Sequence, residues 1–372
     1  MKALGVKNRC RLFEVPKNID FIIAEPRMQR YIDYSAEIYG VYLEYISKDD
    51  IHVYSVDEAF LDVTAYLRLY NKTPREMAVM LMDAVRERVG VRATCGIGTN
   101  LNLTKIALDI TAKHSPDFIG ELDEESYRAT LWNHRPLTDF WRIGPGTVRR
   151  LENYGIHTMG EICKTDESLL YKIFGVDAEL LIDHAWGREP VTIADIKNYK
   201  ASTESFSSGQ VLASGYEPEK ALLVVKEMTD LICLELVERE AVAESITLEL
   251  VYEAYYNAEP ARGTARFSKP ASGDGIIIPA VTGIFERICD RTKKVRRIYI
   301  TVNNLSRDDN NDVLSLFAEE DERQEKNKNV QQAVVSLKKR FGKNVVLKGM
   351  NYKEGATTIE RNGQIGGHKA GK

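Results

Sequence analysis

The chain has 372 residues, of which 44% are hydrophobic and 28% charged, with a formal net charge of −4 at pH 7. The length fits about two to four globular domains, and the charge excludes a strongly basic protein while still allowing local basic patches. There is no apolar run long enough to cross a bilayer, no signal peptide and no C-x-x-C pair among the five cysteines, so we expect a cytoplasmic protein with reduced thiols.

An acidic pair interrupts two short apolar runs near residue 57. A helix is predicted over Tyr31–Val41. After it, Ile51–Val56 predicts a strand, and Ala59–Val63 predicts the hairpin partner of that strand. Asp57 and Glu58 then stand at the tip of the hairpin. Adjacent like charges repel and strands disfavour acidic residues, so the pair indicates a site for a hard divalent cation with oxygen ligands. The alternative is a solvated hairpin turn.

The next segment alternates helices and strands. A helix is predicted over Pro74–Val89, with Thr73 as its N-cap and Gly90 as its C-terminal stop. Its apolar residues recur at helical spacing and should face a sheet; they are Met77, Leu81, Ala84 and Val85. A strand over Val91–Gly98 and an amphipathic helix over Leu101–Lys113 follow. This order around a carboxylate hairpin predicts an α+β domain.

A glycine-rich turn then precedes a basic helix. Ile143, Gly144 and Gly146 lead into Arg149 and Arg150. Glycines let a backbone approach a DNA phosphate, and the free N–H groups at a helix start bind it without reading sequence. The pattern is typical of a helix-hairpin-helix that binds DNA; a plain αα-turn is the alternative.

A polar segment over 195–205 is interpreted as a linker, and a new domain follows it. The elements expected there are a strand from Ser207, a helix over Pro218–Glu240, strands over Ser245–Tyr252 and Gly263–Phe267, a helix over Val281–Thr292 and a strand over Val295–Val302. This order is ferredoxin-like. Basic residues crowd this half of the chain: Arg262, Arg266, Lys269, Arg291, Lys293, Lys294, Arg296 and Arg297. On one sheet face they would bind phosphates; the alternative is a solvated face.

The eight residues Ser55–Asp62, S-V-D-E-A-F-L-D, resemble the signature of the Y-family translesion DNA polymerases, the UmuC-like, ImpB/MucB/SamB-type branch. The resemblance implies that Asp57 and Glu58 lie in a palm domain, are catalytic and help to hold two Mg2+ ions. Gly96–Lys113 resembles a second family pattern, with Thr104 where alanine is usual. There Lys113 corresponds to a lysine that contacts the triphosphate of the incoming nucleotide; a surface lysine at a helix end is the alternative.

The resemblance implies a multidomain right-hand polymerase whose partners are primer-template DNA and deoxynucleoside triphosphates, with no membrane association. The expected parts are 1–28, what remains of the fingers; 29–120, the palm with its carboxylate hairpin; 121–194, a helical thumb with the helix-hairpin-helix; 195–205, the linker; 206–308, a ferredoxin-like little finger that binds DNA; and 309–372, a tail.

The tail contains an apolar island, Val313–Phe317, ahead of an acidic run and a predicted helix over Glu325–Phe341. The island resembles the short peptide by which bacterial polymerases bind the sliding clamp, with Leu314, Leu316 and Phe317 as its anchors and Val313 where glutamine is usual. An apolar staple onto the little finger is the alternative.

One family feature is missing from the sequence. In the family, an aspartate on the first palm strand joins the Asp57–Glu58 pair, and that strand would precede Met1. Two hypotheses follow. Either the parent protein is a translesion polymerase in DNA repair and the SOS response, and this chain alone lacks activity, or the chain is a non-catalytic DNA-binding protein or subunit derived from such a polymerase.

Overall fold

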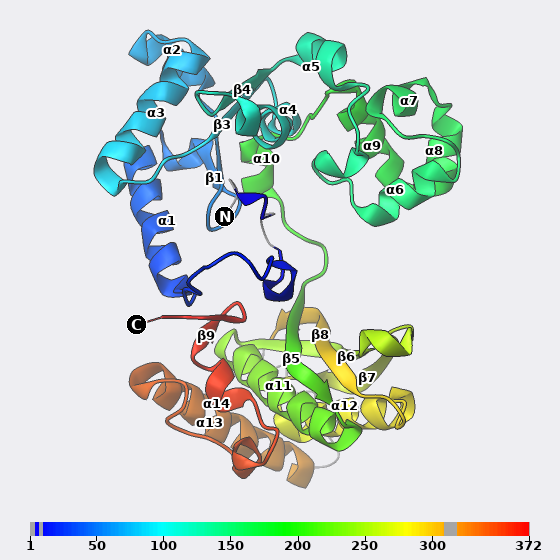
Figure 1. The fold of residues 1–372 in the computed structure, drawn as a ribbon. Coiled ribbons are helices and arrows are strands. Elements are labelled where there is room, and N and C mark those ends of the chain that lie inside the picture. Colours follow the sequence, from blue (N-terminus) through cyan, green and yellow to red (C-terminus); the bar gives the residue numbers. More distant parts are fainter. Residues whose placement is uncertain (1–3, 7–9, 309–317, 372) are drawn as a thin grey trace. The chain divides into compact units, whose positions relative to one another are not determined.

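The structure is a computed structural model, and it describes residues 4–6, 10–308 and 318–371. The chain forms two compact units, one made of Arg30–Lys200 and one made of Ala201–Lys372 together with the first 29 residues. Figure 1 shows the elements of each. In the described part of the chain, no helix is both long and apolar enough to cross a membrane.

The first unit opens with a helix, and the predicted hairpin follows it. Helix α1 (Met28–Leu43) precedes β1 (Ile51–Val53), which pairs antiparallel with β2 (Ala59–Leu61) in the register His52 opposite Phe60. The two strands therefore pair as predicted, although both are shorter than expected. A short helix α2 (Thr64–Tyr70) follows.

Helix α3 (Pro74–Val89) has the predicted bounds because its caps are strong. The Thr73 hydroxyl accepts from the Glu76 N–H, and the Glu76 carboxylate accepts from the Thr73 N–H at 2.8 Å, so two donors at the helix start are satisfied. Gly90 ends the helix with φ of 75°, a conformation that glycine adopts at little cost. The predicted inward residues are all buried: Met77, Leu81, Ala84 and Val85.

A helical run crosses between two parallel strands, β3 (Cys95–Gly98) and β4 (Ile119–Leu122). The predicted single helix is α4 (Leu101–Ile106), continued by a π-helical turn (Ala107–Thr111) and a 3-10 turn (Ala112–His114). The run lies directly on the strands because they carry glycine. A Cβ at Gly96, Gly98 or Gly120 would come closer than 3.0 Å to backbone atoms of the run. These glycines therefore set the height of the run above the strands.

The rest of the unit is a small helical domain around one apolar core. Its helices are α5 (Glu124–Leu131), α6 (Pro145–Glu152), α7 (Met159–Lys164), α8 (Glu167–Phe174) and α9 (Asp177–Trp186). Helix α10 (Ile193–Asn198) follows them and contacts the 3-10 turn Lys48–Asp50 instead. The segment predicted to be a linker, 195–205, thus begins inside α10.

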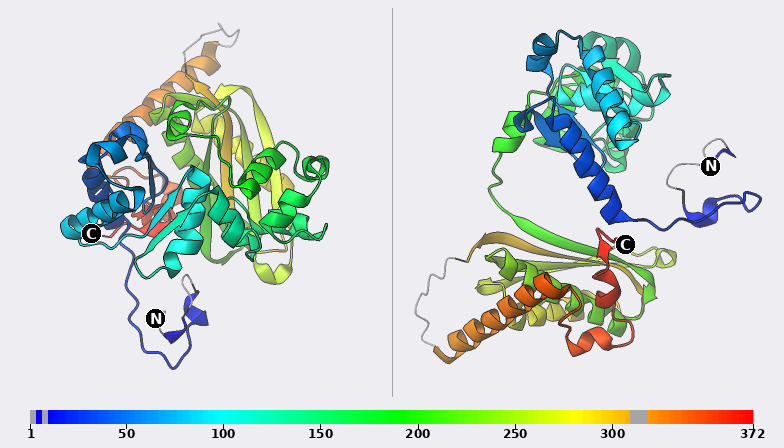
Figure 2. Two further views of the ribbon diagram at one scale, coloured as in Figure 1. Left: turned by 90° about the horizontal axis from the view of Figure 1, so that it is seen from above. Right: turned by 90° about the vertical axis from the view of Figure 1, so that its left-hand side faces the viewer.

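The second unit is built on a four-stranded antiparallel sheet in the order β5-β8-β6-β7. Its elements are β5 (Ser205–Tyr216), α11 (Pro218–Glu238), β6 (Ala241–Tyr252), β7 (Ala261–Ala271), α12 (Asp274–Ile288) and β8 (Val295–Arg307). Both helices pack on one face of the sheet, where the inward residues of the strands form the core (Figure 2).

The predicted β-α-β-β-α-β order is confirmed, but the ferredoxin-like arrangement is wrong. A ferredoxin-like sheet has its first and third strands inside, whereas here the fourth and second strands, β8 and β6, are the inner pair. Both arrangements keep neighbouring strands antiparallel, so element order alone cannot distinguish them. Helix α12 also begins seven residues before the expected Val281, with Pro279 accommodated inside it.

The C-terminal tail packs onto this unit. Helix α13 (Ala318–Phe341) lies against α11, and α14 (Thr358–Arg361) and the hairpin of β9 (Gln364–Ile365) and β10 (His368–Lys369) complete it (Figure 1). The attachment centres on Glu227 of α11, which is 1% exposed. Its carboxylate accepts from Asn351 Nδ2 at 2.8 Å and from the Thr357 N–H at 2.7 Å. The tail is therefore a structural layer of this unit.

Candidate active site

The acidic pair stands at the tip of the β1–β2 hairpin, as predicted. The N–H groups of Tyr54 and Ser55 both donate to the Glu58 carbonyl, at 3.0 and 3.1 Å, and so fix the turn. Asp57 is exposed, and its carboxylate accepts from the Ser55 hydroxyl at 2.6 Å. The side chain of Glu58 is 30% exposed. The two acidic residues are consecutive in the chain, and solvent reaches both carboxylates.

A buried lysine that sequence reasoning missed holds Glu58. The Lys105 ammonium lies 2.8 Å from both carboxylate oxygens of Glu58 and 3.1 Å from Asp109 Oδ2, and its side chain is 8% exposed. Burial alone would lower the pKa of Lys105, but the hydrogen bonds to Glu58 and Asp109 outweigh it and raise that pKa. Lys105 is therefore a fixed cation behind the hairpin tip.

The charges continue along the same helical run to Lys113. Asp109 Oδ1 accepts from Lys113 Nζ at 2.9 Å, and Lys113 is 56% exposed. Burial raises the pKa of Asp109, but the hydrogen bonds from Lys113 and Lys105 outweigh it, so the net shift is downward. The spacing of four residues between Lys105, Asp109 and Lys113 was the sequence signal for this series.

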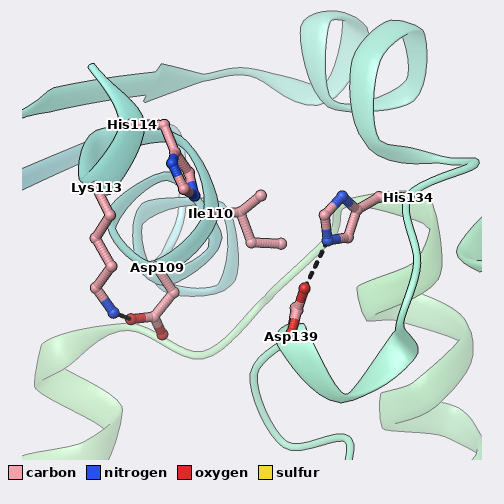
Figure 3. A pocket seen from close by; sticks show the side chains of 6 residues that line it. All are labelled: Asp109, Ile110, Lys113, His114, His134 and Asp139. Atoms are coloured by element: carbon pink, nitrogen blue, oxygen red, sulfur yellow. Dashed lines mark hydrogen bonds and ion pairs between the residues drawn. The ribbon is translucent and has the colours of Figure 1, made fainter. Parts of the chain in front are cut away.

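Lys113 and Asp109 also line a hollow of about 400 Å³ (Figure 3). On its other side His134 and Asp139 pair through Nε2 and Oδ2 at 2.8 Å. His114 lies on the side of Lys113, and Ile110 lies between the two pairs. The hollow thus brings several ionisable side chains beside the lysine predicted to bind a triphosphate.

Aromatic side chains connect the hairpin to the helical domain. Trp141 Nε1 donates to the Tyr54 hydroxyl at 3.0 Å, and the two rings meet edge-on with centroids 6.0 Å apart. On its other side Trp141 stacks on the buried ring of His184 with centroids 5.9 Å apart, and His184 Nε2 bonds Glu189 at 2.9 Å. A bulky, directional contact therefore lies three residues from Asp57.

The donor set at the tip fits a hard cation. Mg2+ is commonly held by one or two carboxylates together with phosphates of a substrate, and Asp57 and Glu58 provide two such carboxylates. Within the described residues, no three His, Cys, Asp or Glu side chains come together to hold a metal. The pair alone therefore offers two carboxylate ligands to a cation.

The glycine-rich turn has an open backbone. Ile143 is buried in the core of the helical domain, whereas a Cβ at Gly144 or Gly146 would meet no atom within 4 Å. Pro145 starts α6, and the described segment between α5 and α6 contains a single 3-10 turn, Leu137–Asp139, and no α-helix. The open glycines leave room for a phosphate, while Ile143 could take part only through its backbone. Behind these glycines, Arg149 and Arg150 are both exposed. The guanidinium of Arg150 lies over the Phe174 ring, 4.4 Å from its centroid.

The basic residues of the second unit divide into two sets. Those just before and at the start of β8 are ion-paired: Arg291, Lys293, Lys294 and Arg296. The others are exposed on strands: Arg262, Arg266, Lys269 and Arg297. The cross-strand register sets Arg262 opposite Glu249 and Arg297 opposite Val251, on the face away from the helices. This face is therefore the basic one.

The predicted clamp-binding residues, Leu314, Leu316 and Phe317, lie outside the described residues.

Known proteins share this organisation. Residues 1–109 match the model of the impB/mucB/samB family, and residues 203–316 match the model of that family's C-terminal domain. A Bacillus subtilis protein that carries the name UV-damage repair protein UvrX is 30% identical over 99% of this chain and 86% of its own length. The DNA polymerase IV 2 of Bacillus subtilis is 27% identical over 99% of this chain and 87% of its own length.

A solved structure gives the same fold. A chimera of the Y-family DNA polymerases Dbh and Dpo4 superimposes with a TM-score of 0.57, at 20% identity, over 76% of this chain and 78% of the chimera. Fold and sequence together define a right-hand DNA polymerase, a nucleotidyltransferase. The chain belongs to the impB/mucB/samB family of Y-family, translesion-type DNA polymerases.

Proposed function

We propose that this chain is the body of a translesion DNA polymerase that extends primers past damaged template bases in DNA repair and the SOS response. The observation that carries the proposal is the adjacent, accessible carboxylate pair Asp57 and Glu58 at the hairpin tip. Two carboxylates are suitable ligands for Mg2+. When bound, Mg2+ would neutralise negative charge on the transferring phosphoryl group. Chromosomal DNA as substrate would place the protein in the cytoplasm.

In this function, Asp57 and Glu58 hold two Mg2+ ions together with a further carboxylate, and Glu58 helps to position the primer 3′ hydroxyl. Lys113, exposed at the edge of the hollow, binds the triphosphate of the incoming nucleotide and offsets charge on the leaving pyrophosphate. The ion pairs that run from Glu58 through Lys105 and Asp109 to Lys113 at the hollow support these roles.

Duplex binding in this function uses two surfaces without reading sequence. The open backbone at Gly144 and Gly146 approaches one phosphate, with Arg149 and Arg150 behind it. The basic face of the second unit binds further phosphates through Arg262, Arg266 and Arg297. Lys269, exposed where the register of β7 shifts, is proposed to add to it. Arg296 contributes less, because it is paired with Glu253 at 3.6 Å.

The 372 residues by themselves are expected to bind primer-template DNA without extending it, since the described residues gather two acidic ligands rather than three. Both oxygens of Glu58 are also bound to Lys105, which favours the second candidate function, a non-catalytic DNA-binding protein derived from a polymerase. Adding the N-terminal segment of a longer relative distinguishes the two, because only a polymerase body gains activity.

The test is primer extension with Mg2+ and all four deoxynucleotides, beside Asp57→Ala and beside a gel-shift measurement of duplex binding. Binding without extension, together with extension after the N-terminal segment is added, supports the proposal. Extension by the chain alone that disappears in Asp57→Ala would mean that another carboxylate completes the site. Absence of duplex binding would contradict both candidate functions.

We also propose that the segment around Leu316 and Phe317 binds the sliding clamp, on its sequence alone. Replacing both residues with alanine should lower clamp affinity in a pull-down without changing duplex binding. Unchanged clamp affinity would exclude this partner.

A further inference from the structure

Lys105 uses all of its hydrogen-bonding capacity on carboxylates. Its ammonium has three N–H donors, and three oxygens lie in reach: both of Glu58 at 2.8 Å and Asp109 Oδ2 at 3.1 Å. The ring of Tyr54 adds a cation–π contact at 5.8 Å. Lys105 therefore already satisfies Glu58 in the absence of any divalent ion.

The position of Lys105 is fixed from the main chain outward. Gly96 and Gly98 bring β3 against the backbone of residues 103–108, so the helix that carries Lys105 cannot move away without losing that contact. On the far side, Asp109 is held by Lys113 at 2.9 Å. A buried ammonium is costly unless it is paired, and here the pairing supplies the compensation.

We propose that Lys105 is a positioning residue that holds Glu58 in place as a built-in cation and competes with the divalent ion for the Glu58 carboxylate. The inference rests on the proposed function, because it takes Asp57 and Glu58 as metal ligands. Lys105 keeps two adjacent acidic side chains ordered when no metal is bound. It also weakens metal binding, because a divalent ion must share a carboxylate with an ammonium that repels it.

Removing the charge should therefore tighten metal binding. At physiological salt, a unit charge about 4–6 Å from a divalent ion in aqueous surroundings changes its affinity by about threefold to tenfold. A purely structural lysine predicts the opposite, since its loss would disorder Glu58 and weaken the site. The direction in which metal affinity changes when Lys105 loses its charge therefore distinguishes a competing cation from a purely structural lysine.

The test measures Mn2+ binding to the 372-residue chain from the electron paramagnetic resonance signal of free Mn2+. Lys105→Met should bind Mn2+ about threefold to tenfold more tightly, and Lys105→Arg, which keeps the charge, should stay near wild type. Lys72→Met makes the same change of charge in the loop after α2 and should have no effect. In a Glu58→Gln background, the effect of Lys105→Met should shrink.

Weaker or unchanged Mn2+ binding by folded Lys105→Met would overturn the inference. If that variant does not fold, as judged by circular dichroism, Lys105→Gln carries the same test because its amide can still donate to Glu58. The proposed function fails separately. If Asp57→Asn and Glu58→Gln leave Mn2+ binding of the wild-type chain unchanged, there is no metal site at the hairpin tip, and the inference falls with it.

Discussion

Two glutamates, one in each unit, are held by contrasting partners. Glu58 is 30% exposed and shares its carboxylate with the ammonium of Lys105, beside a second acidic side chain. Glu227 is 1% exposed, and the donors to its carboxylate are neutral: Asn351 Nδ2 and backbone N–H groups of Thr357 and Thr358. The first carboxylate is accessible to other ligands. The second is not, because its partners belong to the fold.

The difference shows what distinguishes an accessible functional site from a buried structural attachment such as that of Glu227, which we call a clasp. Both glutamates are linked to residues far away in the sequence, so long-range contact alone does not distinguish them. What distinguishes Glu58 from Glu227 is that Glu58 is accessible to solvent and that its partner is a charged side chain. Glu227 instead fastens the tail to α11, and Arg361 extends the attachment by donating to Gln210 Oε1 at 2.6 Å and to the Gly209 carbonyl at 2.9 Å.

The largest effect is expected from Glu227→Ala. The change leaves buried donors of Asn351 and Thr357 without an acceptor, so the free energy of unfolding of the C-terminal unit should fall by about 3 kcal/mol. Urea denaturation measures it. Glu354→Ala, in an exposed pair with Lys220 at 2.5 Å, is the control and should have little effect, because solvent screens such a pair. Equal losses in the two variants would contradict the role of Glu227 as a clasp.

A somewhat smaller effect is expected from Gly96→Ala, which tests the support of Glu58. The new Cβ would come closer than 3.0 Å to backbone atoms of Thr104 and Leu108, so α4 must shift, at about 2 kcal/mol. Gly40→Ala is the control, because its Cβ meets no atom within 4 Å and alanine favours the helix α1. If thermal unfolding gives the same change in midpoint temperature for both variants, the close contact at Gly96 does not contribute to stability.

Local signals predicted much of this structure, and the two glutamates show where such signals end. Helix α3 has its predicted bounds because Thr73 and Gly90 cap it, and the acidic hairpin follows from alternation of the flanking residues. The start of α12 was missed, because Pro279 and nearby glycines predict a break that the fold tolerates.

Partners distant in sequence were beyond such signals. Glu227 falls on the face of α11 that the apolar pattern leaves to solvent, and only the packed tail buries it. The Glu58–Lys105 pair joins residues 47 positions apart, and nothing in either segment specifies the other. The i, i+4 spacing did connect Lys105 with Asp109, but not with the hairpin.

The link between the hairpin and the helical domain should have a smaller effect. Trp141→Phe removes the hydrogen bond to the Tyr54 hydroxyl but keeps an aromatic ring, so we expect a loss of about 1 kcal/mol. A double-mutant cycle with Tyr54→Phe measures the coupling between the two residues. If the losses of the single variants simply add, the contact does not connect the hairpin tip to the helical domain.

The smallest effect is expected from pH, at a buried pair whose charge can change. His184 and Glu189 are each 4% exposed and bond at 2.9 Å. Burial lowers the pKa of His184 below its usual 6.5, more than the hydrogen bond and charge of Glu189 raise it. Between the folded and unfolded pKa values, only the unfolded chain binds the proton, so the stabilisation is complete above pH 6.5 and declines as pH falls.

His184→Gln should therefore make the stability of the first unit less dependent on pH just below 6.5, although it lowers stability at neutral pH. Urea denaturation at several pH values measures this, and His157→Gln, a change of a partly exposed histidine in the same helical domain, is the control. An unchanged slope in His184→Gln would mean that this pair keeps one charge state throughout. It would then resemble the Glu227 clasp rather than the accessible pair at Glu58.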